Sequence, residues 1–286
     1  MQLLKKIGKT PLVKLEAFGD LAVYAKLEYK NPSGSVKDRI AYRMVRDAED
    51  SGVLGKGMGI IEVSSGNTGI GLAMVGKELG HPVTIVTGFG VTDDAKRIIK
   101  AYGAEVVEVE GWNKKCYERV NEIMEGKLGH FFWPNQATSL SALKSNEELG
   151  EEIARQLDVD VFLASMGTGS TITGVARALK KRNPKTKIYL VLPAAEYSVH
   201  GVGDYADTTV PLPLFDKTIV DHEIRIAEED AVKAARRLHS NYGHYVGISS
   251  GAVFAAAEKI SSREKGNAVI IFPDSGNRYT DILSED

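Results

Sequence analysis

The sequence has little cysteine, no long apolar run and almost no excess charge, and each absence excludes a class of protein. Cys116 is the only cysteine among 286 residues, so no internal disulfide can form, which is typical of a reducing compartment. No stretch approaches the ~18 apolar residues that a membrane span needs, and the opening "MQLLKKIGKTPLV" lacks the apolar core of a signal peptide. We therefore expect a cytoplasmic protein without a membrane partner.

The charged residues do not indicate a nucleic-acid or metal-binding protein. The 36 basic and 38 acidic residues leave a net charge of only −2, which gives no reason to expect nucleic acid as a partner. The six histidines lack the spacing of metal ligands, so we expect no metal site. Hydrophobic residues make up 43% of the chain, which is enough for large cores, and the length predicts two globular domains.

Short apolar runs alternate with helical patterns along most of the chain. Strands are expected at 21–28, 59–64, 81–88, 104–110, 159–165, 187–193 and 267–273. Helices are expected at 39–50, 67–80, 92–103, 114–124 and 170–182. This alternation predicts βαβ units and parallel sheets that are covered on both faces. Since one modest sheet cannot hold so many units, we expect two α/β domains with a boundary near residues 136–146.

Four glycine-rich junctions stand between predicted strands and helices. They are "NPSGSVK" (31–37), "SSGNTG" (64–69), "SMGTGST" (165–171) and "GISSGA" (247–252). In open parallel sheets, ligands bind beyond the carboxyl ends of the strands, where such junctions lie. Glycine allows the backbone to approach a ligand closely, and a helix N-terminus offers N–H donors to an anion.

Two of these junctions have the composition of anion sites. Backbone N–H groups and hydroxyls of Gly167, Gly169, Ser170 and Thr171 can form a phosphate cradle, although neither known phosphate-loop pattern is present. The "SSGNTG" stretch offers several neutral donors to a carboxylate. Each has a plain alternative, which is a strand-to-helix turn at 167–171 and a helix-capping turn at 64–69.

Lys37 is unusual because it stands at a predicted helix start, where acidic residues are favoured. A surface lysine is the common alternative. The positive end of the helix dipole lowers the pKa of a neighbouring amine, and a neutral lysine forms imines with aldehydes. An imine-forming lysine together with a phosphate cradle indicates pyridoxal 5′-phosphate, which carries an aldehyde and a phosphate.

The four junctions, in this order, resemble those of the pyridoxal-phosphate dependent cysteine synthases and cystathionine β-synthases of fold type II, most closely the cysteine synthases. The opening "IGKTPLVKL" is also similar, and the resemblance extends from about Ile7 to Tyr279. It implies two doubly wound, three-layer α/β domains with mainly parallel sheets and the cofactor in the cleft between them. Residues 36–140 would form the smaller domain with the mobile substrate loop, and 1–35 plus 141–286 the larger domain with the phosphate turn. A homodimer without a regulatory extension is also implied.

The resemblance assigns roles by matching position. Lys37 would be the catalytic residue, which forms the imine and acts as general base. The cofactor contacts would be Lys37, Asn67, Gly167, Thr168, Gly169, Ser170, Thr171 and Ser249. The substrate carboxylate would be held by Ser64, Ser65, Gly66, Asn67, Thr68 and Gln136.

The resemblance implies that sulfide replaces the activated hydroxyl of an O-activated L-serine through an aminoacrylate, which yields L-cysteine. O-acetylserine is the first choice, because no arginine stands clearly near the loops. O-phosphoserine is the second, with Arg97 or Arg225 as its partner. A serine or threonine deaminase, a cystathionine β-synthase-like enzyme and a silent binding protein remain alternatives. The lysine after "GSV" and the cradle "GTGST" favour the synthases.

Some positions depart from the family pattern. Serine replaces the usual threonine at Ser64 and the usual glycine at Ser170, and Asp204 stands in a stretch, "GVGDY" (201–205), that is normally "GIGAG"-like. The segment "WPNQATSLSAL" leaves open whether Gln136 or Asn135 matches the family's glutamine. These departures bear on the choice of amino-acid substrate.

Overall fold

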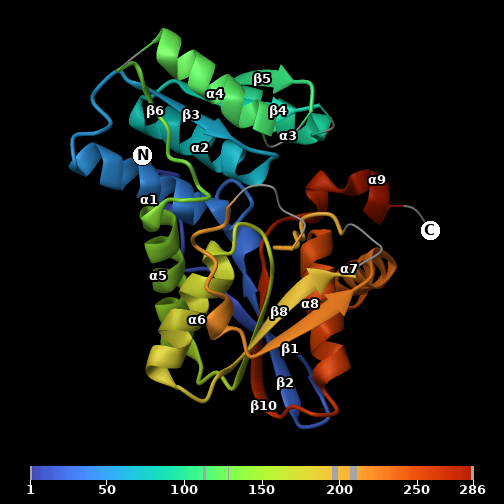
Figure 1. Cartoon of the computed structure of the whole chain (residues 1–286). Coiled ribbons are helices and arrows are strands. Elements are labelled where there is room, and N and C mark those ends of the chain that lie inside the picture. Colours follow the sequence, from blue (N-terminus) through green and yellow to red (C-terminus); the bar gives the residue numbers. More distant parts are fainter. Residues whose placement is uncertain are drawn as a thin grey trace. The chain divides into compact units, whose positions relative to one another are not determined.

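The computed structural model describes residues 2–89, 91–111, 114–127, 129–194, 199–206 and 211–284. Its described residues divide into two compact α/β units (Figure 1). One unit, with a four-stranded sheet, comprises the described residues of 2–7, 31–142 and 211. The other, with a six-stranded sheet, comprises those of 8–30, 143–206 and 212–284. Two α/β domains with mainly parallel sheets were predicted, and this fold class is confirmed.

The four-stranded unit has an entirely parallel sheet in the order β5-β4-β3-β6. Its strands are β3 (Gly59–Val63), β4 (Val83–Gly88), β5 (Glu105–Val109) and β6 (Phe131–Phe132). Its helices are α1 (Lys37–Asp50), α2 (Asn67–Leu79), α3 (Asp93–Ala101) and α4 (Lys114–Gly126), with the short η1 (Leu4–Lys6). Successive residues of β3 pack in different clusters, Ile60 with α1 and α2 and Ile61 with α4, so helices cover both faces.

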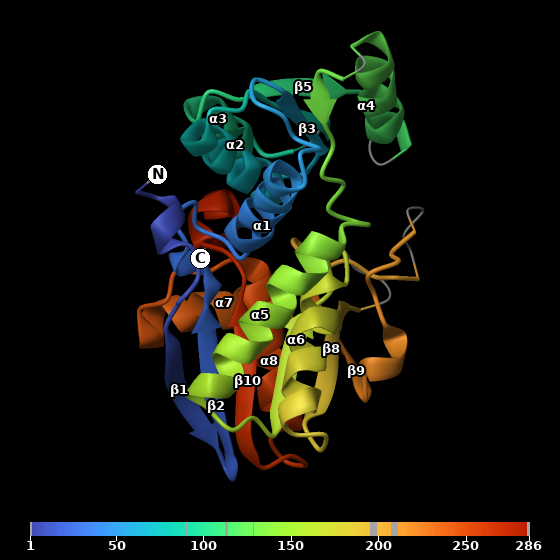
Figure 2. The same ribbon diagram turned by 90° about the vertical axis from the view of Figure 1, so that its left-hand side faces the viewer.

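The six-stranded unit has the order β1-β2-β10-β7-β8-β9, in which only the β1–β2 pair is antiparallel. Its strands are β1 (Leu12–Phe18), β2 (Leu21–Leu27), β7 (Val161–Ser165), β8 (Lys187–Pro193), β9 (His222–Ile226) and β10 (Gly266–Phe272). Its helical elements are α5 (Leu140–Gln156, in this unit from residue 143), α6 (Ser170–Arg182), α7 (Glu228–Tyr242), α8 (Ile248–Ile260), α9 (Thr280–Leu283), η2 (Glu28–Lys30), η3 (Lys217–Ile219) and η4 (Gly276–Arg278). Figure 2 shows α5 and α6 on one face of the sheet, with α8 on the other.

The elements expected from the sequence are all present, and Thr92 caps α3 by accepting from the Ala95 N–H group at 3.4 Å. Strands β1, β6 and β9 and helices α7 and α9 are among the elements that were not predicted. Residues 195–198 and 207–210, on either side of the altered 201–205 stretch, lie outside the described residues. Within the described part of the chain, no helix combines the length and apolar character that a membrane crossing requires.

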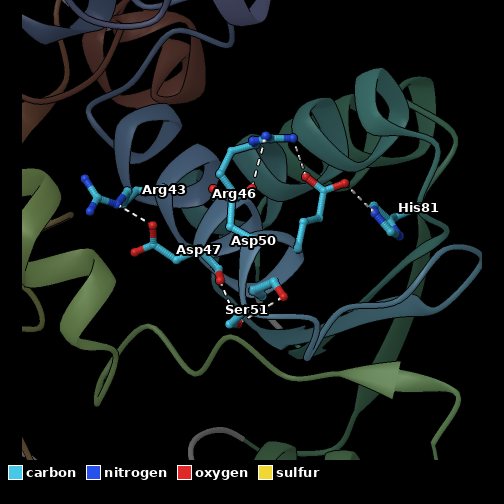
Figure 3. Close-up of polar contacts among 8 residues, drawn as sticks. Arg43, Arg46, Asp47, Asp50, Ser51 and His81 are labelled. Carbon is cyan, nitrogen blue, oxygen red and sulfur yellow. Dashed lines mark hydrogen bonds and ion pairs between the residues drawn. The ribbon is translucent and has the colours of Figure 1, made fainter.

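Ion pairs and hydrogen bonds connect side chains of α1 to one another and to a neighbouring segment of the four-stranded unit (Figure 3). Arg43 pairs with Asp47 at 2.7 Å, and Arg46 pairs with Glu49 at 2.8 Å. Glu49 also contacts the buried His81 ring at 3.2 Å, which ties the helix to the residues before β4. On its inner side, α1 approaches α2 at Gly71, where an added Cβ would lie 3.2 Å from the Lys37 carbonyl oxygen. This close approach fixes the start of α1.

Candidate functional site

Lys37 is the first residue of α1, as the sequence predicted for a helix start. The acidic residue that such a position favours is its neighbour Asp38, which is buried. The Ser33 N–H group donates to the Asp38 carboxylate at 2.6 Å, and the Ser33 hydroxyl donates to it as well. The Lys37 N–H group donates to the Ser35 hydroxyl at 3.3 Å. The helix start is therefore stabilised by neighbouring groups, and the Lys37 side chain is not needed for capping.

The Lys37 amine has a pKa well below that of an ordinary lysine. Burial lowers its pKa from 10.5 to about 8, while the charge of Glu62 acts in the opposite direction. The sequence predicted this direction from the helix dipole, but the structure gives burial as the main cause. At a pKa of about 8, roughly a tenth of the amine is neutral at pH 7, against ~0.03% for an ordinary lysine. A neutral fraction of this size suits both imine formation and proton transfer.

Glu62 was not recognised from the sequence. Its side chain is buried within β3, and its carboxylate accepts from the Val63 N–H at 2.9 Å, the Trp133 indole N–H at 3.3 Å and the Gln136 N–H at 3.2 Å. Burial raises the pKa of this carboxyl to about 7, although these donors lower it. A single carboxylate within the wholly buried strand "GIIEV" was the sequence feature that could have revealed it.

The junction between β3 and α2 contains the predicted carboxylate-binding residues. The Ser64 hydroxyl accepts from the Gly66 N–H at 3.1 Å and from the Gly69 N–H at 2.9 Å. This hydroxyl therefore shapes the loop, as in the capping alternative. Ser65 is exposed, and Asn67 is the half-buried first residue of α2.

Gln136 lies against the same junction. The Thr68 hydroxyl donates to the Gln136 side-chain oxygen at 2.5 Å, and the Gln136 amide nitrogen donates to the Val63 carbonyl at 3.4 Å. The structure thus brings Gln136 together with Thr68, although 68 positions separate them in the sequence. Asn135, the other candidate, has its side-chain oxygen buried with no hydrogen-bond partner among the residues that the structure describes.

The predicted phosphate turn joins β7 to α6 in the six-stranded unit, and its two glycines differ. Gly169 has a φ of +81°, and a side chain there would collide with Phe215, so the fold itself requires glycine. Gly167 is exposed, and an added Cβ would meet nothing within 4 Å. Among the residues that the structure describes, no contact requires glycine at position 167, and the open space above its backbone leaves room for a ligand.

Asn146 of α5 supports this turn and was not predicted. It is fully buried, its amide nitrogen donates to the Ser170 hydroxyl at 3.2 Å, and its oxygen accepts from the Thr171 hydroxyl at 3.4 Å. The Thr168 and Ser170 hydroxyls lie 3.2 Å apart. Gly174 allows α6 to approach α5 here, since an added Cβ would lie 2.7 Å from the Asn146 Cβ. Hydroxyls and N–H groups at this helix start form a neutral cradle suited to a phosphate.

Ser249 is the second residue of α8 and is buried. An added Cβ at Gly201 would lie 3.7 Å from the Ser249 hydroxyl oxygen. The Gly203 N–H group donates to the Met166 carbonyl at 2.8 Å. The 201–203 segment therefore lies near both Ser249 and the residue that precedes the phosphate turn.

The two arginines considered for a phosphate substrate both contact carboxylates. Arg225 donates to Asp204 at 2.7 Å and to the Pro193 carbonyl at 2.7 Å. Burial tends to raise the pKa of the Asp204 carboxyl, but the Ala206 N–H group and Arg225 prevail and lower it. Arg97 is largely exposed and contacts Asp94. Asp204, which departs from the family pattern, thus has a defined partner.

The described residues fit pyridoxal phosphate. Lys37 supplies an amine with a lowered pKa, and the 167–171 turn supplies hydroxyls, N–H groups and an open glycine. Ser249 supplies a neutral hydroxyl. Among the residues that the structure describes, no three histidine, cysteine, aspartate or glutamate side chains gather where they could hold a metal ion.

Comparisons with known proteins indicate the same cofactor. A family model described as "Pyridoxal-phosphate dependent enzyme" matches residues 3–274. A probable cysteine synthase of Bacillus subtilis (strain 168) is 37% identical over 97% of this chain and 96% of that protein. Cysteine synthase A of Escherichia coli (strain K12) is 36% identical over 96% and 91%. The solved structure of a hydrogen sulfide-producing enzyme from Fusobacterium nucleatum is 34% identical, covers 97% of each chain and has a TM-score of 0.92.

Proposed function

The chain belongs to the family of pyridoxal-phosphate dependent enzymes, and we propose that it is a cysteine synthase, which replaces the activated hydroxyl of an O-activated L-serine with sulfide. The observation that carries the proposal is the Lys37 amine at a helix start, with a pKa of about 8, in a chain similar to cysteine synthases over nearly its whole length. The proposal includes a homodimer and a cytoplasmic location, both from the family resemblance.

The proposal assigns cofactor contacts to Lys37, Asn67, Ser249 and the 167–171 turn. When bound, pyridoxal phosphate supplies an aldehyde for the lysine amine and an electron sink for chemistry at the substrate Cβ. The phosphate would be held by N–H groups and hydroxyls of the turn that Asn146 supports. Ser249 offers the pyridine nitrogen a neutral hydroxyl, which does not enforce protonation there and suits replacement at Cβ.

Lys37 would also move the proton. With a pKa of about 8, its amine can accept the Cα proton when neutral and return it when protonated. Ser65, Asn67, Thr68 and Gln136 would bind the substrate carboxylate with neutral donors. The contact between Thr68 and Gln136 supports this assignment, because it places side chains from two distant segments in one cluster.

The leaving group proposed first is acetate from O-acetylserine, with phosphate from O-phosphoserine second. A phosphate group is recognised best by an uncommitted guanidinium. Arg225 is held by Asp204 and a backbone carbonyl, and Arg97 contacts Asp94. A neutral acetyl ester needs no such partner, so these contacts favour O-acetylserine.

The test compares O-acetylserine, O-phosphoserine and serine as substrates, each with and without sulfide. We expect cysteine only with sulfide, at the highest rate from O-acetylserine. Borohydride reduction followed by peptide mapping should attach the cofactor to the Lys37 peptide, and Lys37→Ala should abolish both attachment and turnover. Pyruvate formation that is independent of sulfide would indicate a deaminase instead, and an unmodified Lys37 peptide would indicate a silent binding protein.

A second candidate is release of hydrogen sulfide from L-cysteine. Similarity to the Fusobacterium nucleatum enzyme, with a TM-score of 0.92, favours it. The same Lys37 amine would remove the Cα proton, and sulfide would be the leaving group at Cβ. Incubation with L-cysteine alone, followed by a colorimetric sulfide assay, separates the candidates. Sulfide release faster than cysteine synthesis from O-acetylserine would favour this second function.

A further inference from the structure

Glu62 lies next to the proposed substrate loop but belongs to none of the four motifs. Its carboxylate accepts hydrogen bonds from the N–H groups of Val63, Trp133 and Gln136. The first is in its own strand, and the other two are in the segment that follows β6. The carboxylate therefore joins the end of β3 to residues that are more than 70 positions away in the sequence.

The segment 133–136 is not held by regular secondary structure. Asn135 has a φ of +46°, a left-handed conformation that is uncommon for residues other than glycine and persists where surrounding contacts impose it. The flanking contacts to Glu62, at Trp133 and Gln136, supply such a constraint. Trp133 also packs against Tyr117 of α4, with ring centroids 5.5 Å apart. Since Gln136 follows directly, the clamp on its backbone determines where its side chain lies.

From this geometry we infer that Glu62 is a positioning residue, whose carboxylate clamps the 133–136 segment and holds the Gln136 side chain against Thr68. The inference deepens the proposed function and rests on it, because Thr68 and Gln136 are assigned there to the substrate carboxylate. Glu62 would thus tune recognition of the amino-acid substrate through another residue. It would have no direct effect on the binding of sulfide.

A carboxylate satisfies these contacts together, because it can accept at both oxygens. Glu62→Gln introduces one donor and one acceptor at the same volume. In one orientation its NH2 group faces the Gln136 N–H, and in the other it faces the Val63 and Trp133 N–H groups. Either orientation places donor against donor, so the amide should release at least one side of the clamp.

The decisive experiment compares wild-type protein, Glu62→Gln and the control Glu105→Gln by amide hydrogen exchange and by steady-state kinetics. Glu105 is an exposed residue of the same sheet, on β5. In Glu62→Gln we expect exchange in peptides covering 131–139 to accelerate about tenfold or more. We also expect kcat/KM for O-acetylserine to fall about tenfold or more, and to fall further than kcat/KM for sulfide, which should change only through the effect of the Glu62 charge on Lys37. The control should match wild type in all three measurements.

A second variant and a fluorescence measurement also test the inference. Glu62→Asp retains the charge but withdraws it by one methylene, so if Glu62→Gln does not fold, the same changes are expected in this variant at a smaller size. In a Trp112→Phe background, the emission of Trp133 should change when its carboxylate partner becomes an amide. Unchanged exchange in 131–139 in the folded variants would overturn the inference, as would an equal loss for O-acetylserine and sulfide. Inactivity of wild type with every O-activated serine would instead contradict the proposed function, and the exchange result would still stand.

Discussion

The two glycines of the phosphate turn allow a sharp test, because alanine should have opposite consequences at positions that are two residues apart. At Gly169 the protein itself excludes a side chain, since φ is +81° and Phe215 occupies the space. At Gly167 the added methyl would meet no atom of the described residues within 4 Å. Gly169→Ala should therefore impair folding, whereas Gly167→Ala should impair only the binding of a ligand that uses this space.

The expected magnitudes follow from the local geometry. At Gly169, the positive φ costs alanine about 1 kcal/mol, and overpacking against Phe215 costs about 1–3 kcal/mol. We thus expect Gly169→Ala to lower the free energy of unfolding by about 2–4 kcal/mol. Gly167→Ala should stay within about 0.5 kcal/mol of wild type, as an exposed position without contacts does.

The assay measures unfolding of the cofactor-free protein by urea, and then the dissociation constants of pyridoxal 5′-phosphate and of pyridoxal. Pyridoxal lacks the phosphate but keeps the aldehyde. Gly167→Ala should weaken binding of pyridoxal phosphate about tenfold or more and leave pyridoxal binding unchanged. If the ratio of the two dissociation constants is the same in Gly167→Ala and wild type, the turn does not hold the phosphate, and the assignment of 167–171 fails.

Three further predictions rest on titratable groups with shifted pKa values. Labelling of the Lys37 amine in cofactor-free protein should be half-maximal near pH 8, and Glu62→Gln should lower that midpoint, because the charge of Glu62 raises the pKa of Lys37; an unshifted midpoint would contradict the coupling. The pKa of Glu62 is about 7 in the folded chain and 4.5 ordinarily, so the folded state binds more protons, and the free energy of unfolding should fall by on the order of 3 kcal/mol as pH rises from 4.5 to 7. Urea unfolding across this range, with Glu62→Gln as the comparison that removes the slope, checks it. Cys116 is buried with a raised thiol pKa, so a disulfide reagent should modify the native protein at less than ~1% of the rate for unfolded protein; rapid modification in native buffer would show the thiol to be accessible.

The sequence predicted the two-unit α/β fold because strands that are buried on both faces appear as continuous apolar runs. β3 and β4 consist of buried residues throughout, and so does most of β8, and all three were identified. β1 and β9 lie at the two edges of the six-stranded sheet and contain exposed residues. Their mixed composition resembles a loop, and only pairing with the neighbouring strand distinguishes them.

The motifs identified Lys37 and the 64–68 and 167–171 turns, because each position that the proposed function assigns to a ligand needs a particular chemistry. Covalent attachment requires an amine, and close backbone approach requires glycine or small residues. The hydrogen-bond partner of each individual hydroxyl was harder to predict. Ser64 carries the same group as Thr68, yet its oxygen accepts from two N–H groups of its own loop, whereas Thr68 donates to Gln136. Which hydroxyl serves the loop and which faces a partner depends on backbone geometry.

Glu62 and Asn146 share a role that no local motif records. Each is buried in regular secondary structure, in a different unit, and each hydrogen-bonds a segment that the proposed function assigns to a ligand. A ligand-facing loop restricts its own composition, since its residues must be small or carry donors. A side chain that supports such a loop needs only to reach it from a distant element. Many positions could provide such a side chain, so no recognisable motif surrounds it in the sequence. Substitutions at positions 62 and 146 should therefore alter substrate and cofactor affinity respectively, although neither side chain is assigned a contact with either ligand.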